Sequence, residues 1–185
     1  EPISATPAVD TESNRIFVGT HRGRLCCLSS GDGATRWSTN LPSRTDPRIV
    51  SDLLWLPTQQ AVVCSSWGGR FLALNASSGE INRAWDAGIS PQAGASAGSD
   101  GTLFFQRAVR GEGLLCARMA PDGTETVLHR HPEGKRDASR AVVAAAPVID
   151  EARGIVHFAA NIDASCDLLC WSLAEMRLLW SRRLP

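Results

Sequence analysis

The side chains that could support catalysis or metal binding are six cysteines, four histidines and several aspartates in turns. The cysteines form no C-x-x-C pair, and no histidine lies at finger-like spacing from a cysteine pair, so a zinc site is not expected. Five aspartates in predicted turns do not form the D-x-D-x-D pattern of a calcium loop: Asp32, Asp46, Asp100, Asp122 and Asp163. We predict no catalytic, cofactor-binding or metal-binding residue.

The cysteines indicate a compartment. Five fall within predicted strands: Cys26, Cys27, Cys64, Cys116 and Cys170. Cys166 is expected in the turn before such a strand. Buried free cysteines behave as small hydrophobic residues and are typical of a reducing compartment. We therefore expect a cytoplasmic protein, or a periplasmic or secreted one if a signal peptide has been removed.

Charge and hydropathy exclude two classes of partner. The chain of 185 residues has 19 basic and 19 acidic side chains, so its formal net charge is zero. A nucleic-acid-binding surface would need clustered positive charge, and we expect none. No apolar run approaches the roughly 20 residues that span a bilayer. The start at Glu1-Pro2, without an initiator Met, suggests a piece of a longer chain.

Residues 5–37 predict four short strands separated by turns. We expect these strands at 5–9, 15–20 and 24–29, with the last one ending at Trp37. Sliding the second half of this unit along the chain aligns Gly79 and Gly123 with Gly33, at spacings of 46 and 44 residues. Four strands in a period of 40 to 50 residues are typical of β-propeller blades.

The later units predict strands at corresponding places. They are expected at 49–56, 61–65, 71–75 and a strand closing at Trp85; at 93–98, 102–106, 114–119 and 124–128; and at 141–149, 154–159, 167–172 and 176–182. The fourth unit has the longest turn between its second and third strands, at 161–166. The fold class predicted is all-β.

The pattern P-apolar-V-D, I-F-V-G-T, G-R-L-x-x-L and S-G-x-x-x-W resembles the pyrroloquinoline-quinone-type (PQQ-like) repeat. The resemblance implies one propeller region, 1–185, with four-stranded blades near 1–43, 44–90, 91–137 and 138–185, as part of a seven- or eight-bladed ring. In this family the closing Trp of each blade docks on its neighbour. The implied docking residues are Trp37, Trp85, Trp180, Gly33, Gly79 and Gly123. The third unit departs from the pattern, with Val127 in place of the Trp.

Six residues are candidates for contact with a partner. Trp67, Arg22 and Arg70 fall at turns between second and third strands. His129, Arg130 and His131 open the most polar segment, 129–137, which is expected to be a loop between blades. The plainer interpretation is that Trp67 folds over its own blade and that the polar segment is simply solvated.

These features favour a non-catalytic binding or assembly module, comparable to a WD40-like scaffold, that recognises a protein or peptide or the remaining blades of a longer chain. No cofactor is predicted. One alternative is part of a quinoprotein dehydrogenase, for which the resemblance implies PQQ and calcium and, in some members, a disulfide between adjacent cysteines. Cys26 and Cys27 are such a pair, but they lie mid-strand, where neighbouring side chains point to opposite faces and a disulfide would distort the strand. The other is a propeller domain appended to a cytosolic acyl- or amino-acid-activating enzyme. Whether the chain takes part in catalysis stays open, with the balance against it.

Overall fold

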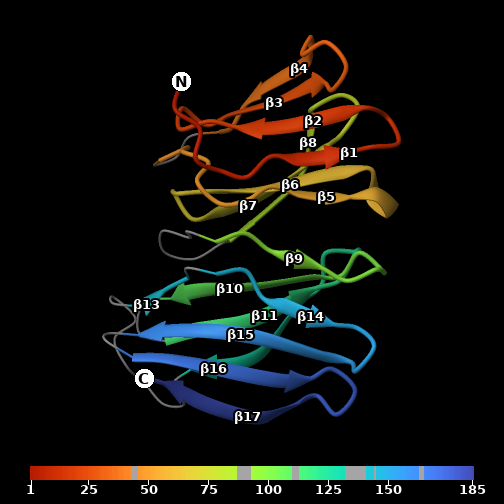
Figure 1. Cartoon of the computed structure of the whole chain (residues 1–185). Coiled ribbons are helices and arrows are strands. Elements are labelled where there is room, and N and C mark those ends of the chain that lie inside the picture. Colours follow the sequence, from red (N-terminus) through yellow and green to blue (C-terminus); the bar gives the residue numbers. More distant parts are fainter. Residues whose placement is uncertain (43–45, 87–92, 110–112, 132–140, 144, 163–164) are drawn as a thin grey trace. The chain divides into compact units, whose positions relative to one another are not determined.

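The computed structural model describes residues 1–42, 46–86, 93–109, 113–131, 141–143, 145–162 and 165–185. These residues form four antiparallel sheets (Figure 1) and one 3₁₀ turn, Pro57–Gln59 (η1). The all-β fold class is confirmed. The chain divides into two compact units, Glu1–Gly94 (unit 1) and Ala95–Pro185 (unit 2). The blade boundaries expected at 43/44, 90/91 and 137/138 involve residues outside the described part of the chain.

The first sheet of unit 1 has the strand order β1-β2-β3-β4. Its strands are β1 (Ala8–Asp10), β2 (Arg15–Gly19), β3 (Arg24–Ser29) and β4 (Thr35–Asn40). Buried and half-buried residues alternate along β2, because successive side chains of a strand point to opposite faces. The β3–β4 turn places Gly33 at φ +73°, a conformation that glycine adopts without strain.

The second sheet of unit 1 has the order β5-β6-β7-β8. Its strands are β5 (Leu54–Leu56), β6 (Ala61–Ser66), β7 (Arg70–Asn75) and β8 (Ile81–Asp86). The continuous strand expected at 49–56 is wrong, since Ile49 forms only an isolated bridge to Ser66. Between this bridge and β5, the Leu53 amide donates to the Thr6 carbonyl at 3.1 Å, and Asp52 accepts the Thr6 amide at 3.1 Å. The segment leaves its own ladder because it bonds to the neighbouring sheet.

The third sheet, in unit 2, has the order β9-β10-β11-β12. Its strands are β9 (Ser96–Ala97), β10 (Leu103–Val109), β11 (Gly113–Met119) and β12 (Glu125–His131). The prediction of a loop beginning at His129 is wrong. His129 pairs with Cys116 and His131 with Leu114, because β11 begins at Gly113 and offers β12 a ladder over its full length. Residues 132–137 of the polar segment lie outside the described residues.

The fourth sheet has five strands: β13 (Ala141–Val142), β14 (Val148–Asp150), β15 (Ile155–Ile162), β16 (Ser165–Ser172) and β17 (Arg177–Leu184). The single strand expected at 141–149 is two strands, which both pair with β15. Pro147 precedes β14 and has no N–H for a ladder. Cys166, expected in a turn, lies in β16 opposite Asn161, because pairing continues to Ile162 and Ser165. Residues 163–164 of that turn lie outside the described residues.

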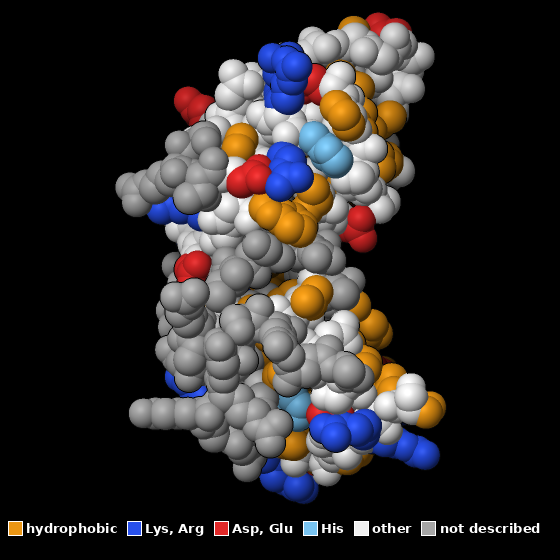
Figure 2. Space-filling view, turned by 90° about the vertical axis from the view of Figure 1, so that its left-hand side faces the viewer, with side chains coloured by type: hydrophobic (Ala, Val, Ile, Leu, Met, Phe, Trp, Pro, Cys, Tyr) orange, Lys and Arg blue, Asp and Glu red, His pale blue; other side chains and the backbone are white. Residues whose placement is uncertain are grey.

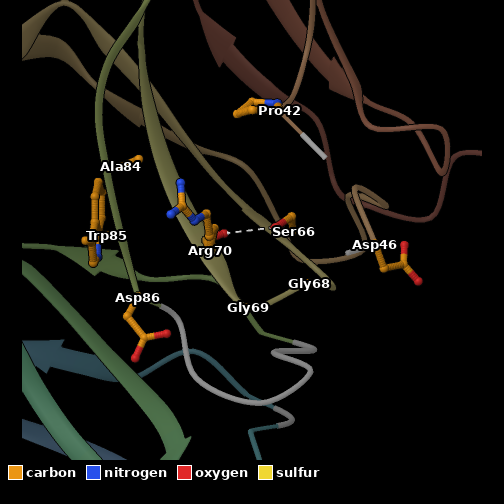
Figure 3. A pocket seen from close by; sticks show the side chains of 9 residues that line it. All are labelled: Pro42, Asp46, Ser66, Gly68, Gly69, Arg70, Ala84, Trp85 and Asp86. Atoms are coloured by element: carbon orange, nitrogen blue, oxygen red, sulfur yellow. Dashed lines mark hydrogen bonds between the residues drawn. The ribbon is translucent and has the colours of Figure 1, made fainter. Parts of the chain in front are cut away.

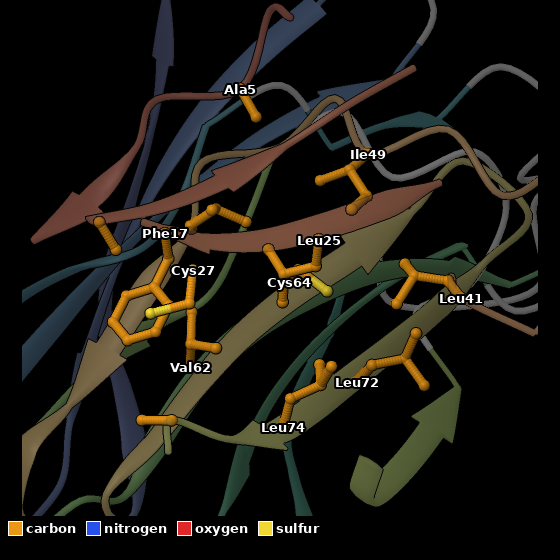
Figure 4. Close-up of a cluster of buried hydrophobic side chains, with 13 residues drawn as sticks. Ala5, Phe17, Leu25, Cys27, Leu41, Ile49, Val62, Cys64, Leu72 and Leu74 are labelled. Carbon is orange, nitrogen blue, oxygen red and sulfur yellow. The ribbon is translucent and has the colours of Figure 1, made fainter. Parts of the chain in front are cut away.

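Within each unit the two sheets contact each other through short strands, β1 beside β5 in unit 1 and β9 beside β14 in unit 2. The sheets of unit 1 pack through a buried apolar cluster (Figure 4). Its members include Phe17, Leu25, Cys27, Ile49, Val62, Cys64, Leu72 and Leu74. Burial raises the pKa of the Cys64 thiol to about 12, so this residue serves as a core hydrophobe.

Candidate functional site

Trp37 joins the two sheets of unit 1. Its ring lies against Gly79 in the β7–β8 turn, and its Nε1 donates a hydrogen bond to the Ala76 carbonyl at 2.9 Å. The hydroxyl of Thr39 donates to the Gly79 carbonyl at 2.7 Å. A Cβ at Gly79 would lie 2.5 Å from Cε3 of Trp37, and φ is +76° there. Glycine is therefore required at this position both by the backbone and by the seated ring.

The other two predicted docking tryptophans, Trp85 and Trp180, differ from Trp37 in register or in exposure. Trp85 lies opposite Phe71 and stacks on it, with ring centroids 5.5 Å apart, whereas Arg83 has the register of Trp37. Trp85 therefore lies two residues beyond the position on β8 that corresponds to Trp37. Trp180 has the register of Trp37 but is 43% exposed, with the His157 ring 5.8 Å away.

The turn glycines share one conformation in three sheets. Gly123 has φ +93°, close to the values at Gly33 and Gly79. The corresponding residue of the fourth sheet is Met176, which has φ +51° without being a glycine. A side chain in the left-handed region is strained, so this turn keeps its shape at a cost in stability.

A buried ion pair in unit 1 escaped the sequence analysis. Arg15 is 4% exposed and Asp10 3%, and their closest atoms, Nη2 and Oδ2, are 2.7 Å apart. The guanidinium also donates to Ser77 Oγ and Gln60 Oε1 at 3.1 Å each, and lies 5.3 Å from the Trp55 ring centroid. The sequence offered one indication of this pair: Arg15 takes an inward-pointing position in a strand and follows Asp10 by five residues. Its partners on the second sheet were not visible from the sequence.

The turns between second and third strands carry three predicted contact residues of unit 1. The Trp67 amide donates to the Arg48 carbonyl at 2.8 Å, and the Arg48 guanidinium lies 5.2 Å from the Trp67 ring centroid. Arg48 is ion-paired with Asp46 at 2.6 Å. The side-chain hydrogen bond from Arg48 lowers the pKa of Asp46 and raises that of Arg48. Trp67 is thus half-buried beside Asp46 and Arg48, whose opposite charges neutralise each other.

Arg22 belongs to the same surface. Arg22 is exposed. The next residue, Gly23, lies so close to Pro47, between Asp46 and Arg48, that a Cβ added at Gly23 would be 2.4 Å from the Pro47 side chain. We call the surface formed by Arg22, Asp46, Arg48, Trp67 and Arg70 the loop face of unit 1. In the upper half of Figure 2, basic, acidic and apolar side chains lie next to one another on the surface.

A pocket of about 370 Å³ opens on the loop face (Figure 3). Its lining includes Asp46, Ser66, Gly69, Arg70, Trp85 and Asp86. Figure 3 shows the Arg70 side chain pointing into the pocket, while the carboxylates of Asp46 and Asp86 point away from its guanidinium. Among the described residues, no ion pair or side-chain hydrogen bond engages that guanidinium. The pocket therefore presents the Arg70 guanidinium, with Asp86 opposite Arg70 on β8. The Trp85 ring lies on the other face of the sheet, stacked on Phe71.

Two of the three predicted contact residues of unit 2, His129 and His131, are half-buried, whereas the third, Arg130, is exposed. His131 Nε2 lies 2.9 Å from Oδ2 of the buried Asp167, whose Oδ1 accepts a hydrogen bond from Arg183 at 3.0 Å. The Arg183 hydrogen bond, opposed by burial and supported by His131, lowers the pKa of Asp167. The His129 ring lies 5.8 Å from Trp171, and Arg130 is exposed. His131 thus connects the two sheets of unit 2.

Comparison with known proteins identifies the family. Residues 1–185 match the family model described as outer membrane protein assembly factor BamB, a family of PQQ-like repeats. The chain belongs to this family. The PQQ-like resemblance is thereby confirmed. A search of curated proteins found no match.

Solved structures similar to this BamB-family chain are β-propellers. BamB from Moraxella catarrhalis superposes with a TM-score of 0.73 at 15% identity, over 98% of this chain and 53% of that one. The β-propeller domain of Cps50 (Swd1) from Myceliophteria thermophila superposes with a TM-score of 0.68 at 14% identity, over 100% of this chain and 56% of that one. The propeller fold is confirmed, and the WD40-like scaffold fits the second structure. The chain spans about half the length of both.

In the described part of this BamB-family chain, no group of three or more His, Cys, Asp or Glu side chains is placed to hold a metal ion. Cys26 and Cys27 are free thiols, half-buried and buried respectively, as neighbours on a strand should be. No helix among the described residues is long and apolar enough to cross a membrane.

One motif was overlooked in the sequence. Residues 94–98, G-A-S-A-G, match the G-x-S-x-G pattern of a nucleophile elbow. Ser96 lies in β9, however, and its Oγ donates to the Pro147 carbonyl at 2.5 Å. The next described element is strand β10 rather than the helix that an elbow requires. The motif therefore has no catalytic geometry.

Proposed function

We propose that this chain is the binding portion of a non-catalytic propeller that recognises a protein or peptide segment at the loop face of unit 1. The observation that supports this proposal best is the Arg70 guanidinium, which points into a 370 Å³ pocket without an acidic partner among the described residues. The family description, an outer membrane protein assembly factor, is compatible with a role in bringing proteins together.

The charges of the loop face favour a carboxylate as the group that enters the pocket. Arg48 is neutralised by Asp46, with Nε–Oδ2 and Nη2–Oδ2 distances of 2.8 and 2.6 Å. Among the described residues Arg70 has no ion-pair partner, and Asp86 is its cross-strand neighbour on β8. A guanidinium binds carboxylates through two parallel hydrogen bonds, and this pairing is stronger than a neutral hydrogen bond. We expect an Asp or Glu side chain, or a chain-terminal carboxylate, beside Arg70.

The apolar groups of the face suit the rest of a peptide. Trp85 is among the residues that line the pocket, with its ring stacked on Phe71. The half-buried Trp67 lies in the β6–β7 turn, between the lining residues Ser66 and Gly68. Binding faces of this kind combine a few positioned polar groups with aromatic surface. A peptide with a carboxylate flanked by apolar residues would satisfy both features.

The test is a positional-scanning library of immobilised peptides, probed with the 185-residue chain and with Arg70→Gln. We expect enrichment of Asp and Glu at one position. We also expect binding of the selected peptide to weaken about 10- to 100-fold in Arg70→Gln, the value of a charge-assisted hydrogen bond. Arg36→Gln, which changes an exposed arginine of β4, is the matched control and should bind normally. No acidic enrichment, or equal loss in both variants, would disprove the proposal.

A further inference from the structure

In unit 1, the Arg15 guanidinium lies between the two sheets at the end where strand β2 begins. Its counter-charge is Asp10, and it also donates to Ser77 Oγ and Gln60 Oε1. The Trp55 ring centroid lies 5.3 Å from Cζ of Arg15. We call these four residues around Arg15 the arginine socket of unit 1. The socket binds a guanidinium through acceptors from both sheets and one apolar wall.

Strand register identifies the corresponding place in unit 2. In the first two strands of the third sheet, Thr102 takes the position of Arg15 and Gly98 takes that of Asp10. The Gly98 amide donates to the Thr102 carbonyl at 2.8 Å, which extends the β9–β10 ladder by one residue. A short hydroxyl side chain therefore replaces the guanidinium, and a residue without a side chain replaces its carboxylate partner.

The facing sheet of unit 2 has smaller residues as well. Ile149 takes the position of Trp55, since each is the middle residue of a three-residue strand that pairs with the following strand. Gly154 takes the position of Gln60, because both have positive φ, +62° and +47°, and both carbonyls accept an amide from the turn before the last strand. The side chains that fill and surround the socket in unit 1 are thus smaller at each of these positions in unit 2.

These smaller residues leave a pocket of about 320 Å³, whose described lining residues all belong to unit 2. The lining includes the four counterparts Gly98, Thr102, Ile149 and Gly154, together with the charged residues Asp100, Arg118 and Glu151. The pocket therefore occupies the place in unit 2 that the guanidinium fills in unit 1.

Two carboxylates converge on this pocket, one from each sheet. A Cβ placed on Gly98 would lie 2.9 Å from Asp100 Oδ1 and 3.1 Å from Glu151 Oε1. Asp100 accepts the amide and the hydroxyl of Thr102, and these hydrogen bonds, the amide first, lower the pKa of Asp100. Glu151 accepts the Ser99 amide, and among the described residues no ion pair engages either carboxylate. Two ionised carboxylates this close together favour a cation between them.

Arg118 is the positive side chain among the described lining residues. It is half-buried on β11, opposite Phe104, and its charge acts on Asp100. One guanidinium against two carboxylates leaves the described lining with one negative charge in excess.

We propose that this pocket binds the guanidinium group of a ligand, in the place where unit 1 holds its own Arg15. A planar guanidinium has five N–H donors in a fork, so it bonds to Asp100 and Glu151 at the same time more readily than a compact ammonium does. Ile149 supplies the apolar wall that Trp55 supplies in unit 1. The site is separate from the loop face of unit 1, and the inference does not depend on peptide binding there.

The test is an NMR titration of the isotope-labelled 185-residue chain with N-acetyl-arginine N-methylamide and with its citrulline counterpart, which has a neutral urea group in place of the guanidinium. We expect the amide signals of Ser99 and Thr102 to shift with the arginine compound. The citrulline compound should bind at least about tenfold more weakly, the value of one charge-assisted hydrogen bond. Glu151→Gln should weaken arginine binding by a similar factor, although Gln still accepts the Ser99 amide. Glu12→Gln, which changes an exposed carboxylate between β1 and β2, is the matched control and should bind normally.

Arg118→Gln distinguishes a cation site from an anion site. Removing this positive charge should leave the affinity for the arginine compound unchanged or raise it, so a loss of affinity would overturn the proposal. Equal binding of the arginine and citrulline compounds, equal binding of a lysine counterpart, or equal losses in Glu151→Gln and Glu12→Gln would overturn it as well.

A titration with ethylguanidinium identifies the source of the group. Tighter binding of the arginine compound indicates an arginine side chain of a polypeptide, and equal or tighter binding of ethylguanidinium indicates a small guanidine. If neither compound shifts the signals of Ser99 and Thr102, the pocket is not a guanidinium site.

Discussion

Removing the charge of Asp10 should destabilise unit 1 far more than removing an exposed carboxylate. Arg15 and Asp10 are 4% and 3% exposed, and Arg15 Nε donates to Asp10 Oδ2 at 2.8 Å. Asp10→Asn preserves the side-chain shape and an acceptor for the amides of Glu12 and Ser13, but leaves the guanidinium without a counter-charge. Breaking a buried pair in this way costs about 3–5 kcal/mol. We expect about 3 kcal/mol, because Ser77 and Gln60 still accept hydrogen bonds from Arg15.

The assay is urea unfolding followed by tryptophan fluorescence, with Asp46→Asn as the matched control. The Asp46 and Arg48 side chains are 32% and 45% exposed, and such surface pairs contribute little to stability because solvent screens them. We expect Asp10→Asn to lower the midpoint strongly at an unchanged slope, and Asp46→Asn to change it little. Equal effects of the two substitutions would refute the reasoning. A double variant, Asp10→Leu with Arg15→Met, should recover part of the loss, since it leaves no unpaired charge.

The pH dependence of the same variant gives an independent check. Burial alone would raise the pKa of Asp10, but the hydrogen bonds from Arg15 and Ser13 lower it below its ordinary value of 3.8. A group whose pKa is lowered on folding contributes its full stability above the unfolded pKa. That contribution is lost as the pH falls through the lower, folded value. The stability difference between wild type and Asp10→Asn should therefore be constant above about pH 5 and shrink below pH 3.8.

Three further experiments test other parts of the fold. Met176→Gly should stabilise the protein by about 0.5–1 kcal/mol in thermal unfolding, because it relieves the left-handed residue; a loss of stability would contradict this. Trp37→Ala should cost about 3–5 kcal/mol and Trp67→Ala about 1 kcal/mol or less, so equal melting temperatures would show that Trp37 is not a docking residue. Iodoacetamide should alkylate the half-buried Cys26 in the native protein at pH 8 and spare Cys64, as mass spectrometry would show; equal rates would contradict the burial and raised pKa of Cys64.

Local chemistry explains why the strands and turns were predictable. The strand Arg24–Ser29 was predicted with its observed bounds, and the turn glycines Gly33, Gly79 and Gly123 all have positive φ. Alternating apolar residues and turn-forming residues act over a few positions, so they are legible in a single sequence. The same local signals failed at His129–His131, where polarity suggested a loop, because a paired neighbouring strand outweighs local preference.

What the sequence alone determined is the all-β fold, the repeat and its family. The tertiary structure decided which side chains meet between neighbouring sheets. Arg15 meets Gln60 and Ser77, and His131 meets Asp167, across sequence separations of 36 to 62 residues. Trp85 was misplaced by the repeat alignment because strand register depends on the bulge and on the facing strand. The physical reason is common to all of these cases: packing between sheets depends on three-dimensional proximity, which local sequence patterns do not encode.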